Sequence, residues 1–126
     1  MTERAHPTGS RCWLVPDAFL PGASGRGAIS HEAVCVLNTG SEAARLRLTF
    51  YFEDREPDQS RELVVEGRRT WHIRLDDAGA LGLELPVDTP FAYQVDSDEP
   101  VTVQHSRLDT SHGGYTLATT AAIPGR

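Results

Sequence analysis

Three stretches of the chain combine histidine with arginine or acidic residues. They are residues 30–38, 68–74 and 101–110. In an extended strand, every second side chain lies on the same face. The third stretch opens with β-branched residues, so we predict a strand there. One face of this strand is predicted to carry Val101, Val103, His105, Arg107 and Asp109. Such a strand leads from a hydrophobic core into a polar site or a subunit interface.

The candidate residues for a ligand site or an interface come from these three stretches. They are His31, Glu32, Arg69, His72, Arg74, His105, Arg107 and Asp109. If the second and third stretches are neighbouring strands, the row of His72 and Arg74 merges with the row that contains His105 and Arg107. The merged patch would bind a carboxylate or a sugar hydroxyl, or form a hydrogen-bonded network across a subunit seam.

The histidines and arginines also have simpler interpretations. His31, His72 and His105 could bind zinc if their strands were adjacent, but close spacings such as CxxC or HxxxH are missing. We therefore favour hydrogen bonding at strand ends or at an interface, and we predict no metal site. The arginines could hold an anion, but we favour internal ion pairs. Their expected partners are Glu32, Glu56 and Asp109.

The two tryptophans pose the same kind of choice. Trp13 and Trp71 could stack on a sugar, but a tryptophan in a sandwich strand more often fills the core, and we favour the core.

We find neither a nucleophile with its base nor a complete metal motif, so we predict that the protein is not an enzyme and needs no cofactor.

Composition limits the class of protein. The 126 residues suit one domain, and 39% of them are hydrophobic, which is enough for a core. The net charge of −6 argues against nucleic acid and against anionic membrane surfaces as partners. The chain contains arginine but no lysine, which excludes Schiff-base chemistry and a P-loop.

The first residues do not resemble a signal peptide, and the apolar runs are too short for a membrane span. We therefore expect a cytoplasmic protein in which Cys12 and Cys35 are reduced.

Hydrophobic alternation predicts the elements that position these residues. The clearest strand is 43–53, with Leu46, Leu48, Phe50 and Phe52 facing the core. Further strands are expected at 12–15, ended by Pro16, and at 28–38, 62–66, 68–75, 91–95, 101–109 and 115–122. An acidic turn at 96–100 should join two of them, and 76–90 should be a connection with one helical turn. The sequence therefore predicts an all-β fold, a single-domain antiparallel β-sandwich of seven to eight strands. It should span residues 11–122, between a flexible N-terminus at 1–10 and a flexible tail at 123–126.

Four ordered motifs resemble the soluble sensory rhodopsin transducer family. They are Ser30-His31-Glu32-x-x-Cys35-x-Leu37-Asn38, Phe52-x-Asp54-x-Glu56-Pro57, Arg69-Thr70-x-His72-x-Arg74 and Val103-Gln104-His105-x-Arg107-Leu108-Asp109. The resemblance covers about residues 11–122. It departs at Ala18, where the family pattern has a glycine nearby, and at Ala122, where an aromatic residue is expected.

The resemblance implies a small cytoplasmic β-sandwich that assembles as a homotetramer. It implies a non-enzymatic signalling or adaptor role, with a membrane-embedded rhodopsin or another signalling protein as partner. The alternative is a binding module for a small polar ligand, sugar-like or anionic, held by the histidine and arginine strand face.

Overall fold

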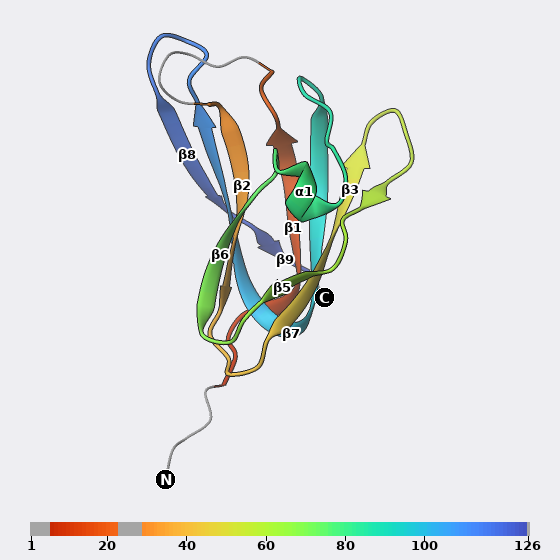
Figure 1. Ribbon diagram of the computed structural model, residues 1–126, viewed down its shortest axis with the longest axis vertical. Helices are drawn as coiled ribbons and strands as arrows, with labels where there is room; N and C mark the ends of the chain where they lie inside the picture. Colours follow the sequence, from red (N-terminus) through yellow and green to blue (C-terminus); the bar gives the residue numbers. More distant parts are fainter. Residues whose placement is uncertain (1–5, 23–28, 126) are drawn as a thin grey trace.

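Two antiparallel sheets pack face to face and share one long strand. The computed structural model describes residues 6–22 and 29–125. Figure 1 shows β7 (Pro90–Asp109) running down one sheet, bending at the bottom of the view and continuing up the other. The fold is therefore the predicted all-β sandwich, in which β7 connects the layers.

The first layer, sheet A, forms around the first half of β7. That half pairs with β1 (Ser10–Phe19) and with β3 (Ala44–Phe52). The short strands β4 (Asp58–Gln59) and β5 (Leu63–Val65) pair with β3, and β9 (Ile123–Pro124) pairs with β1.

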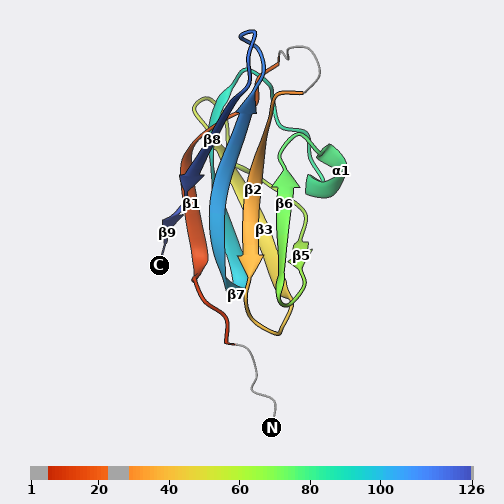
Figure 2. The same ribbon diagram turned by 90° about the vertical axis from the view of Figure 1, so that its left-hand side faces the viewer.

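The second layer, sheet B, forms around the second half of β7. That half lies between β2 (His31–Asn38) and β8 (Thr116–Ala121). The strand β6 (Arg69–Arg74) pairs with the far side of β2. Figure 2 shows the four strands side by side in the order β8, β7, β2, β6. The strand β6 is therefore separated from β7 by β2.

The acidic stretch at 96–100 is part of a strand, so the turn predicted there is wrong. Along β1, Ser10 pairs with Val101 while Cys12 pairs with Asp96. The residues between them on β7 form a bulge, and a bulge bends a strand and increases its twist. The Ser97 hydroxyl donates to the Glu99 carbonyl at 2.7 Å, and the Asp98 carboxylate accepts from the Arg45 amide at 2.8 Å. These polar side chains thus satisfy backbone groups at the bend.

Strand β1 does not end at Pro16, contrary to the prediction. It continues to Phe19, and its register against β7 shifts between Val15 and Ala18. Proline cannot donate to a ladder, but it is tolerated at a bulge, where the ladder is already interrupted. The bulge therefore keeps β1 in the sheet.

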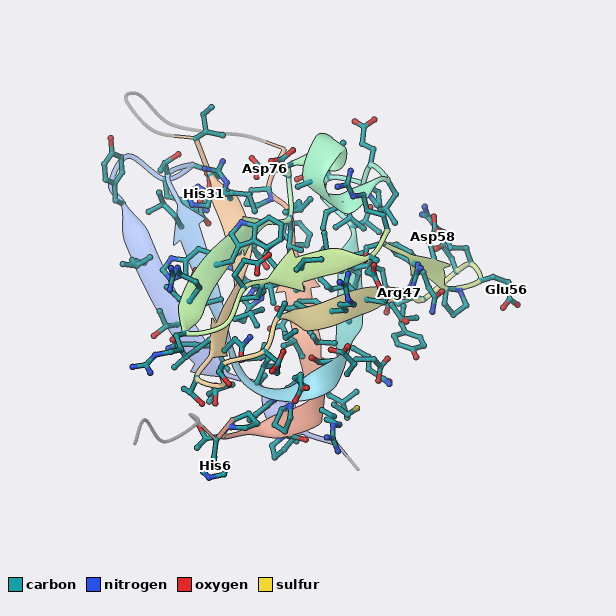
Figure 3. The ribbon with its side chains drawn as sticks, turned by 60° about the horizontal axis from the view of Figure 1, so that its bottom comes forward. His6, His31, Arg47, Glu56, Asp58 and Asp76 are labelled. Atoms are coloured by element: carbon teal, nitrogen blue, oxygen red, sulfur yellow. The ribbon has the colours of Figure 1, made fainter. Side chains whose placement is uncertain are left out.

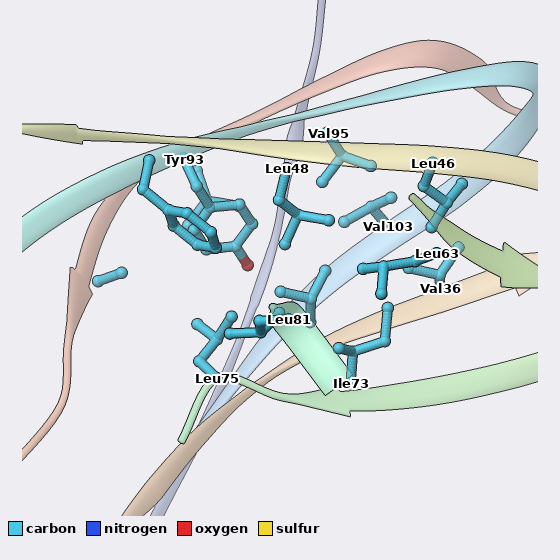
Figure 4. Close-up of a cluster of buried hydrophobic side chains, with 14 of the residues drawn as sticks. Val36, Leu46, Leu48, Leu63, Ile73, Leu75, Leu81, Tyr93, Val95 and Val103 are labelled. Atoms are coloured by element: carbon cyan, nitrogen blue, oxygen red, sulfur yellow. The ribbon is translucent and has the colours of Figure 1, made fainter. Parts of the chain in front are cut away.

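The core lies between the sheets where the alternation predicted it. Leu46, Leu48 and Phe50 are at most 1% exposed, and Phe52 packs partly buried against the same cluster. Figure 4 shows the β3 leucines facing side chains of sheet B, with Leu81 between the layers. Leu81 belongs to the short helix α1 (Ala78–Leu81), which is the helical turn expected in this connection. Trp13 and Trp71 also pack against the core, as favoured from the sequence.

Both ends of the described chain are attached to the sandwich. Residues 123–124, expected in a flexible tail, form β9, and the Gly125 amide donates to the Cys12 carbonyl at 2.7 Å. Near the other end, Thr8 donates its amide to the Thr39 hydroxyl at 2.9 Å. Gly9 adopts φ +116°, and a Cβ there would lie 2.0 Å from the Val101 carbonyl oxygen, so only glycine fits. The described residues contain no helix long and apolar enough to cross a membrane.

Candidate functional site

A buried carboxylate, a histidine and an arginine meet inside the sandwich. Glu32 is fully buried, and its Oε1 lies 2.6 Å from His105 Nε2. Its Oε2 accepts from Arg107 Nε at 2.5 Å. The Phe19 amide also donates to Oε1, at 3.1 Å. A buried charge is costly unless it is paired and hydrogen-bonded, and here the arginine supplies the opposite charge.

Tyr93 extends this network into the core. Its hydroxyl lies 2.7 Å from His105 Nδ1, and both side chains are buried. Because a carboxylate oxygen only accepts, His105 Nε2 carries the proton toward Glu32. In the neutral ring, Nδ1 then accepts from the Tyr93 hydroxyl. Burial first, and then the charges of Glu32 and Cys35, raise the pKa of the Tyr93 phenol well above its ordinary value, so it keeps this proton.

The strand register brings these four side chains together. In sheet B, Glu32 lies opposite Arg107 and Val34 lies opposite His105, all on the inner face. Tyr93 and His105 belong to the same strand, β7. In a straight strand the intervening residues would separate them by about 40 Å. The bend at the bulge folds the strand back and brings Tyr93 to hydrogen-bonding distance.

We expect Tyr93→Phe to lower the free energy of unfolding by about 1–3 kcal/mol, because it leaves the buried His105 Nδ1 without a partner. Urea denaturation would measure the loss. Tyr51→Phe is the matched control, because its hydroxyl is exposed and its bond to Gln94 is long, at 3.4 Å. Equal losses for the two substitutions would show that the buried hydrogen bond stabilises the fold no more than the exposed one.

Arg107 borders two cavities that open beside the network. The first, which we call the Arg107 cavity, has a volume of about 280 Å³ and lies between β1 of sheet A and β8 of sheet B. Its walls include Val15, Pro16, Ala118, Thr120 and Ile123. The second, which we call the acidic cavity, has a volume of about 400 Å³. Three of its lining residues are aspartates: Asp17, Asp88 and Asp109.

The predicted merger of the two polar rows is wrong. Across sheet B, His72 pairs with Cys35 and Cys35 pairs with Gln104, so these side chains share the outer face. His105 lies on the inner face. The merger required β6 and β7 to be neighbours, but β2 lies between them and the two rows point to opposite sides of the sheet.

Two further candidates, Arg74 and Arg69, have local partners. Arg74 donates two hydrogen bonds to Asp76, at 2.8 and 2.7 Å. This hydrogen-bonded arginine lowers the pKa of the Asp76 carboxyl, with a smaller contribution from His31. Figure 3 shows His31 and Asp76 near each other. Arg69 donates to backbone carbonyls of its own turn.

Neither Asp109 nor Glu56, the other two expected acidic partners, forms an ion pair with an arginine among the described residues. Asp109 accepts from the amide and hydroxyl of Ser111, which lowers the pKa of its carboxyl. Glu56 is exposed, at the tip of the loop between β3 and β4. The zinc alternative also fails on geometry, because His31 and His72 lie on the outer face of sheet B and His105 on the inner face. Of the expected internal ion pairs, the one between Arg107 and Glu32 is observed.

Sequence reasoning missed Tyr93, Asp17 and the β8 wall of the cavity. A signal for Tyr93 was available, because it alternates with Phe91 and Val95 and so had to be buried. A buried tyrosine hydroxyl needs a hydrogen-bond partner. No comparable signal marks Asp17 or β8, because their positions depend on how the two sheets meet.

Comparisons with known proteins agree over nearly the whole chain. The sequence profile of the family described as "Anabaena sensory rhodopsin transducer" matches residues 8–124. The crystal structure of Thermotoga maritima 1070 is similar, with 36% sequence identity and a TM-score of 0.84, covering 94% of this chain and 97% of that one. The structure of the Anabaena sensory rhodopsin transducer has 41% identity and a TM-score of 0.70, covering 81% and 90%. No protein with curated annotation matches the sequence.

Proposed function

Because this chain belongs to the Anabaena sensory rhodopsin transducer family, we propose that it is a non-enzymatic signalling or adaptor protein. It acts in the cytoplasm as a homo-oligomer, a tetramer, and docks on a membrane-embedded rhodopsin or another signalling protein. The family supports a transducer-like role. The surface chemistry of sheet B supports self-association.

The outer face of sheet B carries this proposal, because none of the strand residues that form it is acidic. Its residues are small, apolar or neutral polar, apart from two histidines and one arginine. They are Thr70, His72 and Arg74 of β6, His31, Ala33, Cys35 and Leu37 of β2, Thr102, Gln104, Ser106 and Leu108 of β7, and Leu117, Thr119 and Ala121 of β8. The arginine, Arg74, is already paired with Asp76. By contrast, Arg45, Arg47 and Asp96 occupy the outer face of sheet A.

A second copy of the chain suits this face better than a strongly charged partner. Each copy has a net charge of −6, so copies repel one another over most of their surfaces. The outer face of sheet B avoids that repulsion. Threonine, serine and glutamine both donate and accept hydrogen bonds, so the face can match itself across a two-fold axis. Exposed leucines add apolar area: Leu37 is 43% exposed and Leu117 is 70% exposed.

We expect the wild-type protein to have a mass several times 13.8 kDa by light scattering. Ser106→Arg should reduce that mass, because it places an unpaired charge in the middle of a face whose one arginine is already paired. The matched control is Thr49→Arg, which adds the same charge to the outer face of sheet A and should leave the mass unchanged. Circular dichroism would confirm that both variants are folded.

These experiments test separately whether the protein forms a homo-oligomer and whether the outer face of sheet B is its interface. A wild-type mass of 13.8 kDa at high concentration would overturn the homo-oligomer. An oligomer that Ser106→Arg leaves intact would overturn only the assignment to sheet B.

A second candidate function, a binding module for a small polar ligand, rests on one observation. Arg107 is fixed by a fully buried carboxylate and also lines a cavity. Its side chain therefore both pairs with the core and faces a space that a ligand could occupy. Binding would be lost on altering the cavity and unaffected by Ser106→Arg, so the two functions can be tested separately.

A further inference from the structure

We propose that the Arg107 cavity binds a small organic carboxylate with an apolar body. The inference deepens the second candidate function and rests on it, because it specifies the chemical class of the ligand. It makes no use of the oligomeric state.

The guanidinium of Arg107 presents donors that the protein leaves unused. Its Nε donates to Glu32, but its two Nη atoms make no hydrogen bond to any residue in the described ranges 6–22 and 29–125. One Nη also lies 3.9 Å from Oδ1 of Asp17, which is beyond hydrogen-bonding distance. The Asp17 side chain is 90% exposed, so water screens its charge.

Glu32 makes this arginine a fixed recognition group. A flexible arginine loses side-chain entropy when it binds a ligand, whereas one held at Nε has already lost much of it. A planar fork with free Nη donors matches the two oxygens of a carboxylate. The position of Arg107 is therefore set before any ligand arrives.

The walls of the cavity select for an apolar body. Val15, Pro16, Ala118, Ala121 and Ile123 contribute mostly alkyl surface. His105 also lines the cavity, but both of its ring nitrogens are already engaged. Apart from Arg107 and the exposed Asp17, the remaining polar side chain is Thr120. A sugar would bury several hydroxyl groups with few partners, which costs binding free energy.

The charges around Arg107 and the volume of the cavity narrow the chemical class of the ligand further. The acidic cavity on the other side of Arg107 has two further aspartates, Asp88 and Asp109, besides Asp17, which borders both cavities. These two carboxylates would repel an anion, so the carboxylate of the ligand should enter from the β8 side. The volume of about 280 Å³ is below the range typical of drug-sized ligands, which suits a short aliphatic acid.

The test uses 3-methylbutanoate as the probe, followed by the amide NMR signals of Ala118 and Thr120. We expect saturable shifts in the wild-type protein. Acetate lacks the apolar body, 3-methylbutanamide lacks the charge, and glucose lacks both. Each should bind at least about 10-fold more weakly, because a charge-assisted pair or a buried alkyl group contributes at least that factor.

Two variants locate the site. Ala118→Phe fills the cavity from an exposed strand position while Glu32, His105 and Arg107 keep their own side chains, and it should abolish binding. Thr119→Phe is the matched control, because it adds the same ring to the opposite face of β8 and should bind like the wild type. Arg107→Gln should weaken binding about 10- to 100-fold, provided that circular dichroism shows a folded protein.

Three results would overturn the proposal. The first is the absence of saturable binding of 3-methylbutanoate at millimolar concentrations. The second is equal binding of the acid and the amide, and the third is unchanged binding in Ala118→Phe. Glucose binding that Ala118→Phe abolishes would overturn the carboxylate class while supporting a ligand-binding function, so the two failures remain distinguishable.

Discussion

Replacing Glu32 by alanine is expected to lower the free energy of unfolding by about 3–5 kcal/mol, because it breaks a buried ion pair on one side only. The substitution leaves Arg107 Nε, His105 Nε2 and the Phe19 amide without their common acceptor. The arginine can turn toward solvent, but the histidine is only 5% exposed and cannot. Urea denaturation followed by circular dichroism at neutral pH measures the change.

Asp76→Ala is the control, because Asp76 also pairs with an arginine at close distance but at the surface. The Asp76 and Arg74 side chains are 34% and 42% exposed, so we expect a loss of only about 0–1 kcal/mol. The arginine lowers the pKa of Asp76, so this small stabilisation is present at neutral pH. It is lost as the pH falls through the lowered pKa. Similar losses for the two substitutions would contradict the importance that we give to burial.

Replacing Leu48 by alanine should lower the free energy of unfolding by about 2–5 kcal/mol, because it leaves a cavity in a packed core. Leu48 is 0% exposed and lies between the two sheets (Figure 4). Thermal and urea denaturation would measure the loss.

The matched control makes the same change at an exposed position of the same sheet. Leu14 is 37% exposed on β1, and Leu14→Ala should cost less than half as much as Leu48→Ala. A larger loss at Leu14 than at Leu48 would mean that the inner and outer faces of sheet A are assigned the wrong way round.

The path of β7 differs from the one that its local sequence predicts. The acidic residues 96–100 have the composition of a turn, and the sequence predicts one. The structure keeps them in a strand, because β1 pairs with β7 at Asp96 and again at Val101, and β3 pairs with it at Asp96 and Ser97. Propensity is a weak preference that such tertiary contacts override. The same explanation holds for Pro16, which a bulge accommodates within β1.

The candidate site was only partly predictable for a related reason. The individual residues Glu32, His105 and Arg107 stood out by type and spacing, and the alternation placed the last two on one face. Their connection to Glu32 depends on the register between β2 and β7, which no local pattern records. The inclusion of His72 and Arg74 failed because it assumed a strand order that the chain does not have.

The sequence by itself determined the period of two along each strand, and with it the residues that face the core. It placed Leu46, Leu48 and Phe50 inside, as well as Val101 and Val103, because alternation is a property of the extended backbone. Only the tertiary structure decided which strands are neighbours and where β7 bends. Those features arise from backbone pairing between segments far apart in the chain. The contact between Tyr93 and His105 depends on the bend, and the Arg107 cavity depends on β8 crossing from sheet B toward β1.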